Sequence, residues 1–181
     1  MRHDLPGDGR LRPFEESDAD ELYALTDRNR AHLEPWLPWV PATRSASDSL
    51  EFIRMARRLL DGDEGMHLAL VDDGAIVGTV GFHRFDWANR ATSIGYWLAA
   101  DHEGRGLMTE AVRTLVEYAF EIRSLHRIEI AAAVDNARSR AIPERLGFQE
   151  EGIRREAERV GGRYLDLVVY GLLAPVTDRG S

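Results

Sequence analysis

The sequence predicts a mixed α/β fold, with about seven strands and about four helices in a single domain that spans residues 1–181. Three observations predict this class. Three strand-like patterns follow one another between residues 66 and 99, separated by turn residues. An amphipathic stretch over residues 107–120 has the spacing of a long helix, and a strand-like alternation over residues 127–134 follows it. A chain of 181 residues with 44% hydrophobic content can bury one substantial core and is too short for two comfortable domains.

The N-terminal part is predicted to contain one strand, two helices and a loop between the helices. A short strand covers residues 10–14. A helix over residues 17–29 follows, because its first serine stands three residues before an aspartate, as in a capping box. Residues 31–44 contain three prolines and two tryptophans, which favours an ordered loop over a regular helix. A second helix is predicted over residues 47–60.

The middle of the chain is predicted to form a meander that leads into a crossover helix. Strands at residues 66–71, 75–83 and 91–99 are separated by turn signals. The helix over residues 107–120 then places its apolar side chains on one face. Because this helix connects two strands, we expect a right-handed crossover. The strand at residues 127–134 should then run parallel to the strand before the helix. The apolar side chains are Leu107, Met108, Ala111, Val112, Leu115, Val116, Ala119 and Phe120.

The C-terminal part is predicted to contain a shorter helix and a hairpin. The helix begins at about residue 137 or 139 and runs to residue 146, where Gly147 ends it. Two strands follow at residues 148–159 and 163–173, and the two glycines between them suit a tight hairpin turn.

Composition narrows the class of function. The net charge of -8 and the pI near 5.3 disfavour nucleic acid as a partner. The acidic excess suits cationic acceptors such as amines, with solubility alone as the alternative explanation. No apolar run approaches the roughly 20 residues that a membrane span needs, and the polar N-terminus lacks the apolar middle of a signal peptide. We therefore expect a cytoplasmic protein with no membrane partner. The chain has no cysteine, which excludes disulfides and thiolate catalysis.

A glycine-rich turn directly before the crossover helix is the strongest chemical signal. Gly104 and Gly106 allow the backbone to approach an anion closely, and the first helical turn offers unpaired N–H groups. A pyrophosphate fits this geometry, and Arg105 could add a charge-assisted contact. The alternative is a tight turn that binds no ligand. The spacing contains neither the Gly-Lys-Ser/Thr of a P-loop nor the third glycine of a Rossmann fingerprint.

Four segments in this order resemble the Gcn5-related N-acetyltransferase (GNAT) superfamily, especially its branch of ribosomal-protein N-terminal acetyltransferases. They are HLEPWLPWV (residues 32–40), GYWL (95–98), EGRGLMTEA (103–111) and DNARSRAIPERLGF (135–148). The resemblance implies a mostly antiparallel sheet in which one parallel pair of strands splays apart. It also implies that acetyl-CoA enters this gap as the acyl donor, with no metal. Glu103 and Met108 depart from the family's Gln/Arg-x-x-Gly-x-Gly/Ala pattern.

The resemblance assigns cofactor contacts to three parts of the chain. The pantetheine arm would pair with the backbone near Trp97 and Leu98, and a backbone N–H near Leu98 could polarise the thioester carbonyl. Asn136 and Ser139 would lie nearest the pantetheine and the sulfur, although both residue types also cap helices. The expected contacts at the phosphate turn are Gly104, Arg105, Gly106, Leu107, Met108 and Thr109.

The resemblance also suggests catalytic and acceptor residues. Ser139 is the candidate acid for the leaving sulfur and Glu158 the candidate base, with a solvated strand charge as the alternative for Glu158. Trp36, Trp39 and Tyr164 are expected to line the acceptor cleft, unless the tryptophans belong to the core. The six histidines show no metal-ligand spacing.

The leading functional hypothesis is acetylation of a protein α-amine, with a ribosomal protein as the expected type of acceptor. A second hypothesis keeps the chemistry and changes the acceptor to a polyamine or an antibiotic amine, or the donor to a longer acyl-CoA such as succinyl-CoA. A third is a non-catalytic CoA-sensing or partner-binding domain, which the departures at Glu103 and Met108 favour. Related enzymes are often dimers, so a homodimer is also expected.

Overall fold

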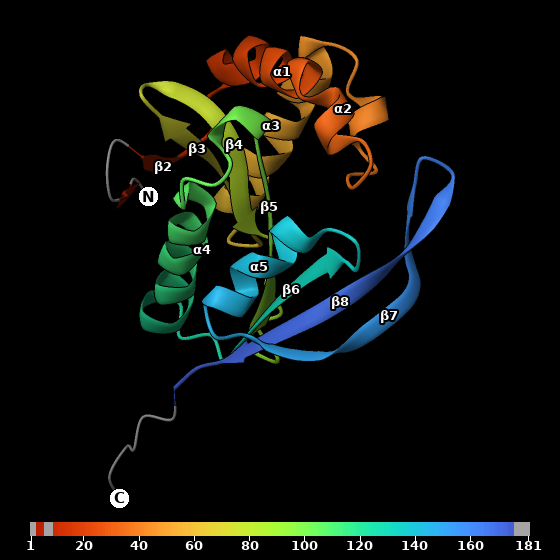
Figure 1. Cartoon of the computed structure of the whole chain (residues 1–181). Coiled ribbons are helices and arrows are strands. Elements are labelled where there is room, and N and C mark those ends of the chain that lie inside the picture. The colour runs from red at the N-terminus through yellow and green to blue at the C-terminus, as the bar shows by residue number, and fades with distance from the viewer. Residues whose placement is uncertain (1–2, 6–8, 176–181) are drawn as a thin grey trace, which may run out of the picture.

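The computed structural model describes residues 3–5 and 9–175. Within these residues the chain forms eight strands in one sheet, in the order β1-β2-β3-β4-β5-β6-β8-β7, and five α-helices (Figure 1). The mixed, mostly antiparallel class is confirmed. The strands are β1 (His3–Asp4), β2 (Arg10–Pro13), β3 (Met66–Asp72), β4 (Ala75–Phe82), β5 (Ala91–Leu98), β6 (Arg127–Ala133), β7 (Gln149–Val160) and β8 (Arg163–Leu173). The helices are α1 (Ala19–Arg28), α2 (Arg30–Leu33), α3 (Ala46–Asp61), α4 (Leu107–Glu117) and α5 (Ala137–Arg145).

The parallel pair β5 and β6 splays apart as expected. The two strands pair only from Ala91 with Arg127 to Ser93 with Glu129, and their remaining residues diverge. On its other side β5 stays paired with β4 as far as Leu98, and β6 stays paired with β8 over its whole length. The sheet therefore opens in a V between β5 and β6, and this opening leaves backbone groups on the inner edges of both strands without a strand partner (Figure 1).

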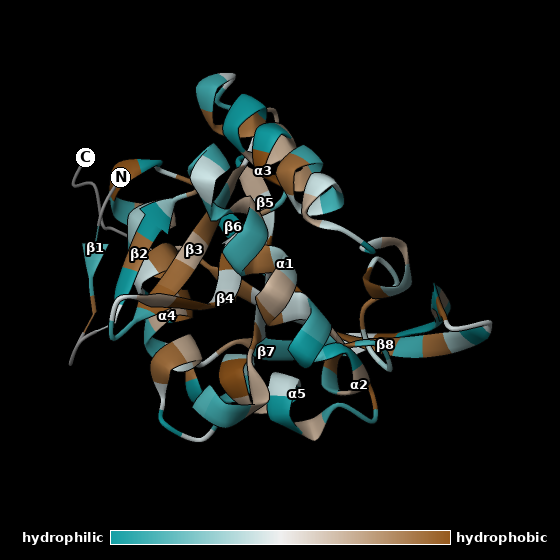
Figure 2. Cartoon of the chain, turned by 90° about the horizontal axis from the view of Figure 1, so that it is seen from above, coloured by the Kyte–Doolittle hydropathy of each residue, from teal (hydrophilic) through white to brown (hydrophobic). Residues whose placement is uncertain are grey.

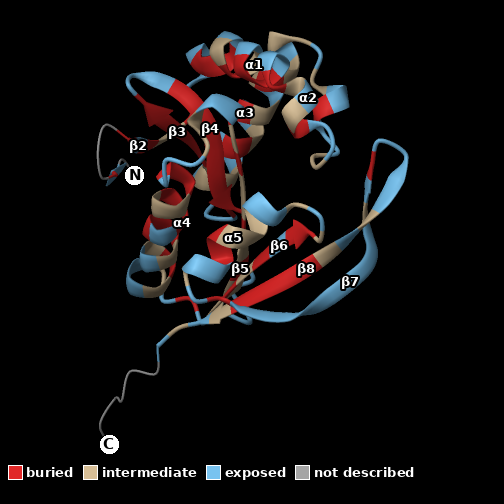
Figure 3. Ribbon diagram, in the orientation of Figure 1, coloured by how far each residue is buried: buried red, intermediate tan, exposed pale blue. Residues whose placement is uncertain are grey.

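Side chains on the two faces of the sheet form two separate apolar cores. Leu68 and Leu70 of β3 lie in the core that α4 covers, whereas Ala69 and Val71 lie in the core that α1 and α3 cover. This alternation follows from the two-residue period of a strand. The buried positions concentrate in the central strands and on the inner sides of the helices (Figure 3). Hydropathy follows the same division, with hydrophobic residues in the central strands and polar positions along the outer helices (Figure 2).

The expected capping box near Ser17 was wrong. The box forms between Glu15 and Asp18, and a short 3₁₀ turn (Glu16–Asp18) precedes α1. Asp18 is held by two hydrogen bonds from the Arg12 guanidinium, of 2.6 and 2.9 Å, while its Oδ2 also accepts from the Glu15 N–H. The contact with Arg12 on β2 favours Asp18 as the residue that completes the capping box. The spacing of residues in the local sequence does not reveal this contact.

The proline-rich segment contains more helical structure than the loop we expected for residues 31–44. One helical turn, α2, occupies its start, and a 3₁₀ turn (Val40–Ala42) follows. Arg30 fixes the segment because its guanidinium donates to the carbonyls of Val40 and Thr43, at 2.7 and 2.8 Å. The crossover helix also differs from the expected range: α4 ends at Glu117, and a π-helical turn (Tyr118–Ile122) completes it.

The C-terminal hairpin has the predicted turn. Gly161 and Gly162 have φ values of 55° and 83°, which suit the two central positions of a tight hairpin turn. Two irregularities interrupt the β7–β8 register, one of them between Arg154 and Glu158. Bulges of this kind bend a strand and redirect its side chains.

Among the described residues no helix has the length and apolarity needed to cross a bilayer.

Candidate active site

A cleft of about 1770 Å³ runs through the opening between β5 and β6. Its volume exceeds the roughly 300–1,000 Å³ of an ordinary small-molecule pocket, so it has room for more than one ligand. Most of the residues singled out from the sequence line this cleft. They are Trp36, Trp39, Trp97, Leu98, Gly104, Gly106, Leu107, Met108, Thr109, Asn136, Ser139 and Glu158.

The glycine turn has the geometry of an anion site. Gly104 and Gly106 have φ values of 74° and 81°, a left-handed conformation that glycine adopts without strain. Gly106 is the N-cap of α4, so the first amides of the helix point out of its end. Among the described residues, no protein atom accepts a hydrogen bond from the backbone N–H groups of residues 104–109. These amides are available to a ligand.

Arg105 lies away from the cleft. Its guanidinium contacts the carboxylate of Asp72 at 2.8 Å, at the turn between β3 and β4. The Asp72 side chain is only 4% exposed, and His102 approaches the same carboxylate at 3.8 Å. Arg105 therefore anchors the glycine turn to the body of the sheet, and its expected contact with phosphate remains a prediction that this placement does not favour.

Glu103 has two partners, an imidazole and a guanidinium. One carboxylate oxygen lies 3.2 Å from His32 Nε2 on α2, and the other is hydrogen-bonded to the Arg138 guanidinium at the start of α5. Glu103 is 22% exposed, whereas Arg138 is 76% exposed, and both line the cleft. Sequence reasoning missed Arg138 as a cation beside the glycine turn. Its position, two residues after the Asn136 cap, could have indicated it.

Asn136 and Ser139 are joined by the predicted cap. The Ser139 N–H donates to Asn136 Oδ1 at 3.1 Å, which shows that Asn136 caps α5. Across the opening, the Tyr96 hydroxyl donates to the Ser139 carbonyl at 2.8 Å, and the Ser139 hydroxyl lies 3.4 Å from the Tyr96 oxygen. Two hydroxyl groups therefore meet on the side of the sheet that α4 and α5 cover. Tyr96 was missed as a site residue.

Glu158 enters the cleft from the edge of the sheet. It follows the bulge in β7, where the N–H of Glu156 donates to Asp166 Oδ1 at 2.7 Å. Burial raises the pKa of the Glu158 carboxyl above its usual value. Its carboxylate has no hydrogen-bond or ion-pair partner among the residues that the structure describes. A half-buried, unpaired carboxylate with a raised pKa is a better proton acceptor than a solvated one.

The opposite side of the cleft is aromatic. The rings of Trp39 and Trp97 lie 5.9 Å apart with an angle of 48°. The proline-rich segment over residues 31–44, called the tryptophan loop below, therefore packs on β5. Tyr164 does not line the cleft: it is 61% exposed on the β7–β8 hairpin. Its expected role in acceptor binding therefore stays a prediction, now with the side chain placed outside.

Two histidines lie on the α3 side of the cleft. The rings of His67 and His83 are 5.9 Å apart, and His83 Nδ1 lies 2.9 Å from the Ser93 hydroxyl. Gly95 makes room for His83, because a Cβ there would lie 2.8 Å from the imidazole ring. Burial lowers the pKa of His83, and burial together with the charge of His83 lowers the pKa of His67 to about 4. Both imidazoles are therefore neutral at pH 7.

No group of three or more side chains suited to a metal ion occurs in the described ranges.

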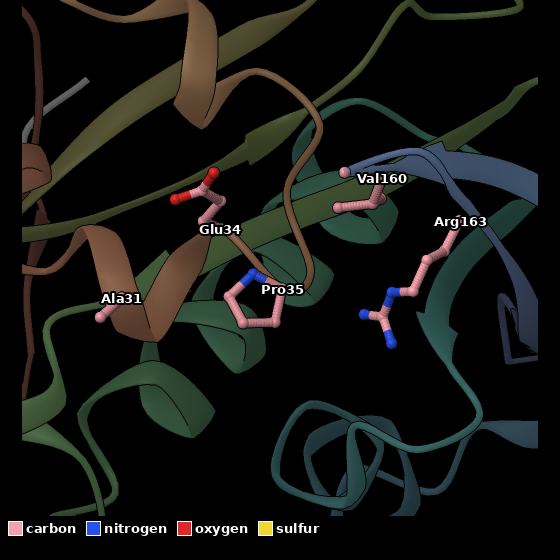
Figure 4. A pocket seen from close by; sticks show the side chains of 6 residues that line it. Ala31, Glu34, Pro35, Val160 and Arg163 are labelled. Carbon is pink, nitrogen blue, oxygen red and sulfur yellow. The ribbon is translucent and has the colours of Figure 1, made fainter.

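A second, smaller pocket of about 260 Å³ lies between the tryptophan loop and the hairpin turn. Glu34 and Arg163 stand on opposite sides of it, with Pro35 between them (Figure 4). The pocket brings the tip of the β7–β8 hairpin close to the end of α2. Its lining residues are Ala31, Glu34, Pro35, Val160, Gly161 and Arg163.

Comparisons with known proteins agree with this geometry. A family model described as an acetyltransferase (GNAT) domain matches residues 10–149. The chain is 42% identical over 164 residues, 90% of each chain, to YdaF of Bacillus subtilis, named as a candidate ribosomal N-acetyltransferase. It is 27% identical, over 88% of this chain and 89% of the relative, to a ribosomal-protein-serine acetyltransferase of Escherichia coli. A crystal structure of the microcin C7 self-immunity acetyltransferase MccE, in complex with acetyl-CoA and AMP, has a TM-score of 0.89 at 29% identity. That match covers 94% of this chain and 93% of MccE.

Proposed function

The chain belongs to the acetyltransferase (GNAT) family, and from this membership we propose that it transfers an acetyl group from acetyl-CoA to the α-amine at a protein N-terminus. The described sheet is continuous from β1 to β7, which supports one acetyltransferase domain over residues 1–181. Two of the similar proteins are named for acetylation of ribosomal proteins, and this supports a protein of that kind as the acceptor.

The observation that carries the proposal is the set of free amides at residues 104–109, next to the opening between β5 and β6. A diphosphate satisfies such amides and is favoured by the positive end of the α4 dipole. Arg138, which lines the cleft and pairs with Glu103, is a candidate for a charged contact with the diphosphate. Its link with Glu103 also weakens the case for a non-catalytic domain, since the carboxylate is already compensated when the donor arrives.

The two faces of the sheet carry different side chains, which suggests that one face binds the acyl donor and the other binds the acceptor. The face covered by α4 and α5 carries the glycine turn and Ser139, and suits the donor. The face covered by α1 and α3 carries Trp39, His67 and His83, and suits the acceptor. The unpaired inner edge of β5 can hold the donor's pantetheine amides by backbone hydrogen bonds, near Trp97 and Leu98. The thioester and the amine then meet in the opening.

The chemistry needs a neutral amine, a polarised carbonyl and a protonated leaving group. The amine nitrogen attacks the thioester carbon, the C–S bond breaks, and the proton lost by the amine balances the one gained by the thiol. Glu158 takes the amine proton, and Ser139 supports the departing sulfur. An α-amine, with a pKa of about 7.7–8.0, is partly neutral at physiological pH, whereas a lysine near 10.4 is almost wholly charged. A single half-buried carboxylate is therefore better matched to an N-terminal acceptor.

The test uses two peptides that differ only in their free amine. One peptide carries a free α-amine and no lysine, and the other has a blocked N-terminus and one lysine. Because the chain has no cysteine, a thiol-reactive dye reports released CoA without a protein background. We expect CoA to raise the melting temperature and the free α-amine peptide to be acetylated. No thermal shift at millimolar CoA, or acetylation of the lysine peptide alone, would contradict the proposal.

A further inference from the structure

Tyr96 occupies the opening between β5 and β6 on the donor face. The side chains of β5 alternate: Tyr96 packs against the core under α4, whereas its neighbour Trp97 belongs to the core under α1 and α3. The phenol therefore projects from β5 toward α5 across the part of the opening where no strand pairing occurs. It links the two walls of the cleft.

The backbone explains why the phenol bonds to Ser139. In a helix the carbonyl of one residue accepts from the N–H four residues later. For Ser139 that residue is Pro143, which lies inside α5 and has no N–H to donate. The Ser139 carbonyl is thus left without its usual helical donor, and the Tyr96 hydroxyl donates to it at 2.8 Å. Pro143 removes the helical donor to the Ser139 carbonyl, and the Tyr96 hydroxyl takes the place of that donor.

The same phenol also faces the Ser139 side chain. Because its one proton is used on the carbonyl, its oxygen can only accept from the Ser139 hydroxyl, and that distance is 3.4 Å. Such a bond is long, so the Ser139 hydrogen can turn toward another acceptor while the bond to the carbonyl persists. Asn136 holds the Ser139 N–H on the other side. Burial keeps the phenol neutral by raising the pKa of Tyr96.

We propose that Tyr96 is a positioning residue for Ser139: it holds the serine so that its hydroxyl faces the sulfur of the acyl donor as the C–S bond breaks. This inference rests on the proposed acetyl transfer. During the step Ser139 donates a hydrogen bond to the developing thiolate, the thiolate takes a proton from solvent, and Glu158 returns the amine proton to solvent, so the protons balance. Tyr96 keeps its own proton throughout and acts on the reaction through Ser139.

The test compares Tyr96→Phe with a matched loss of a tyrosine hydroxyl. Tyr170 on β8 also holds α5, because its hydroxyl accepts from Arg140 Nε at 2.9 Å and donates to Glu144 at 2.8 Å, but it does not line the cleft. We expect Tyr96→Phe to lower kcat about tenfold, the size of one lost hydrogen bond, with little change in CoA affinity. Tyr170→Phe should leave kcat unchanged and lower only the melting temperature.

A double-mutant cycle separates positioning from direct catalysis. If Tyr96 acts through Ser139, then Tyr96→Phe lowers kcat in the wild-type background and has no further effect when Ser139→Ala is already present. An undiminished, multiplicative effect in the Ser139→Ala background would overturn the proposal, since Tyr96 would then act on its own. A normal kcat for Tyr96→Phe would also overturn it. If wild-type protein neither binds CoA nor releases thiol, the proposed function itself has failed instead.

A third variant tests the role of the proline. Pro143→Ala restores a backbone N–H four residues after Ser139, and this N–H can bond to the carbonyl in place of the phenol. In this background we expect the kcat penalty of Tyr96→Phe to shrink to less than about threefold, a small part of one hydrogen bond. A full tenfold penalty in Pro143→Ala would show that the carbonyl bond is not what positions Ser139.

Discussion

At the scale of single residues, the chemistry of the cleft depends on which charged groups are already occupied. Glu103 is bound by His32 and Arg138, and Asp72 is bound by Arg105. Glu158 differs from both because it is half-buried and has no partner among the described residues. A carboxylate in that state holds its proton to a higher pH than a solvated one and accepts protons more readily. This distinction makes Glu158 the best candidate base.

The pH dependence of the reaction tests Glu158. The base works only when it is deprotonated, so kcat/KM should fall as the pH drops through the raised pKa of this carboxyl. Glu158→Gln should remove this acid limb and lower kcat about 100-fold or more, the usual contribution of a general base. Rates would be measured from pH 5 to 9 with saturating acetyl-CoA.

Glu156→Gln is the matched control for this profile. Glu156 lies on the same bulge of β7 but is exposed and does not line the cleft. It should retain the rate and the acid limb of the wild type. If Glu158→Gln kept the same acid limb, the base would be another group, and His83 would be the first to examine because it lies in the cleft beside Ser93.

At the scale of elements, the turn before α4 combines two requirements in one short segment. The left-handed glycines aim the amides of the helix end into the cleft, and Arg105 ties the turn to β3 through Asp72. The glycines and the helix start were predictable because spacing and periodicity are local signals. The contact of Arg105 with Asp72 was not predictable, because the two residues lie more than thirty positions apart in the sequence. The same holds for Tyr96, whose hydrogen bond depends on a proline in a different element.

Gly106→Ala tests the turn. At a φ of 81° an alanine is strained, so the variant should lose about 1–2 kcal/mol of unfolding free energy. Escape from that strain would turn the amides away from the ligand, and we expect CoA affinity to fall about tenfold, or 1.4 kcal/mol. Urea unfolding and calorimetric titration with CoA measure the two effects.

The control for the turn is a glycine with the same backbone conformation elsewhere. Gly162 has a φ of 83° in the β7–β8 hairpin, and an added Cβ meets nothing within 4 Å at either glycine. Gly162→Ala should therefore lose similar stability and keep wild-type CoA affinity. Equal CoA affinities in the two alanine variants would show that the turn does not bind the cofactor.

At the scale of the whole molecule, the opening in the sheet connects two faces that have different cores and different chemistry. The order of elements and the parallel crossover could be predicted, because periodicity and right-handed connection rules constrain them. The splay followed only from the resemblance to a known family, since no local pattern marks where Ser93 and Glu129 stop the pairing. The two-residue strand β1 was missed because it is too short to show a period.

The most direct test of the account is a titration of isotope-labelled protein with CoA, followed by backbone amide NMR. The amides of residues 104–109 have no acceptor in the part of the protein that the structure describes, so a bound diphosphate should shift their proton signals strongly downfield. The amides of Gly161 and Gly162, in the β7–β8 hairpin turn outside the cleft, should move little. Signals from residues 104–109 that stay unchanged at saturating CoA, while others shift, would contradict the claim that this turn binds the acyl donor.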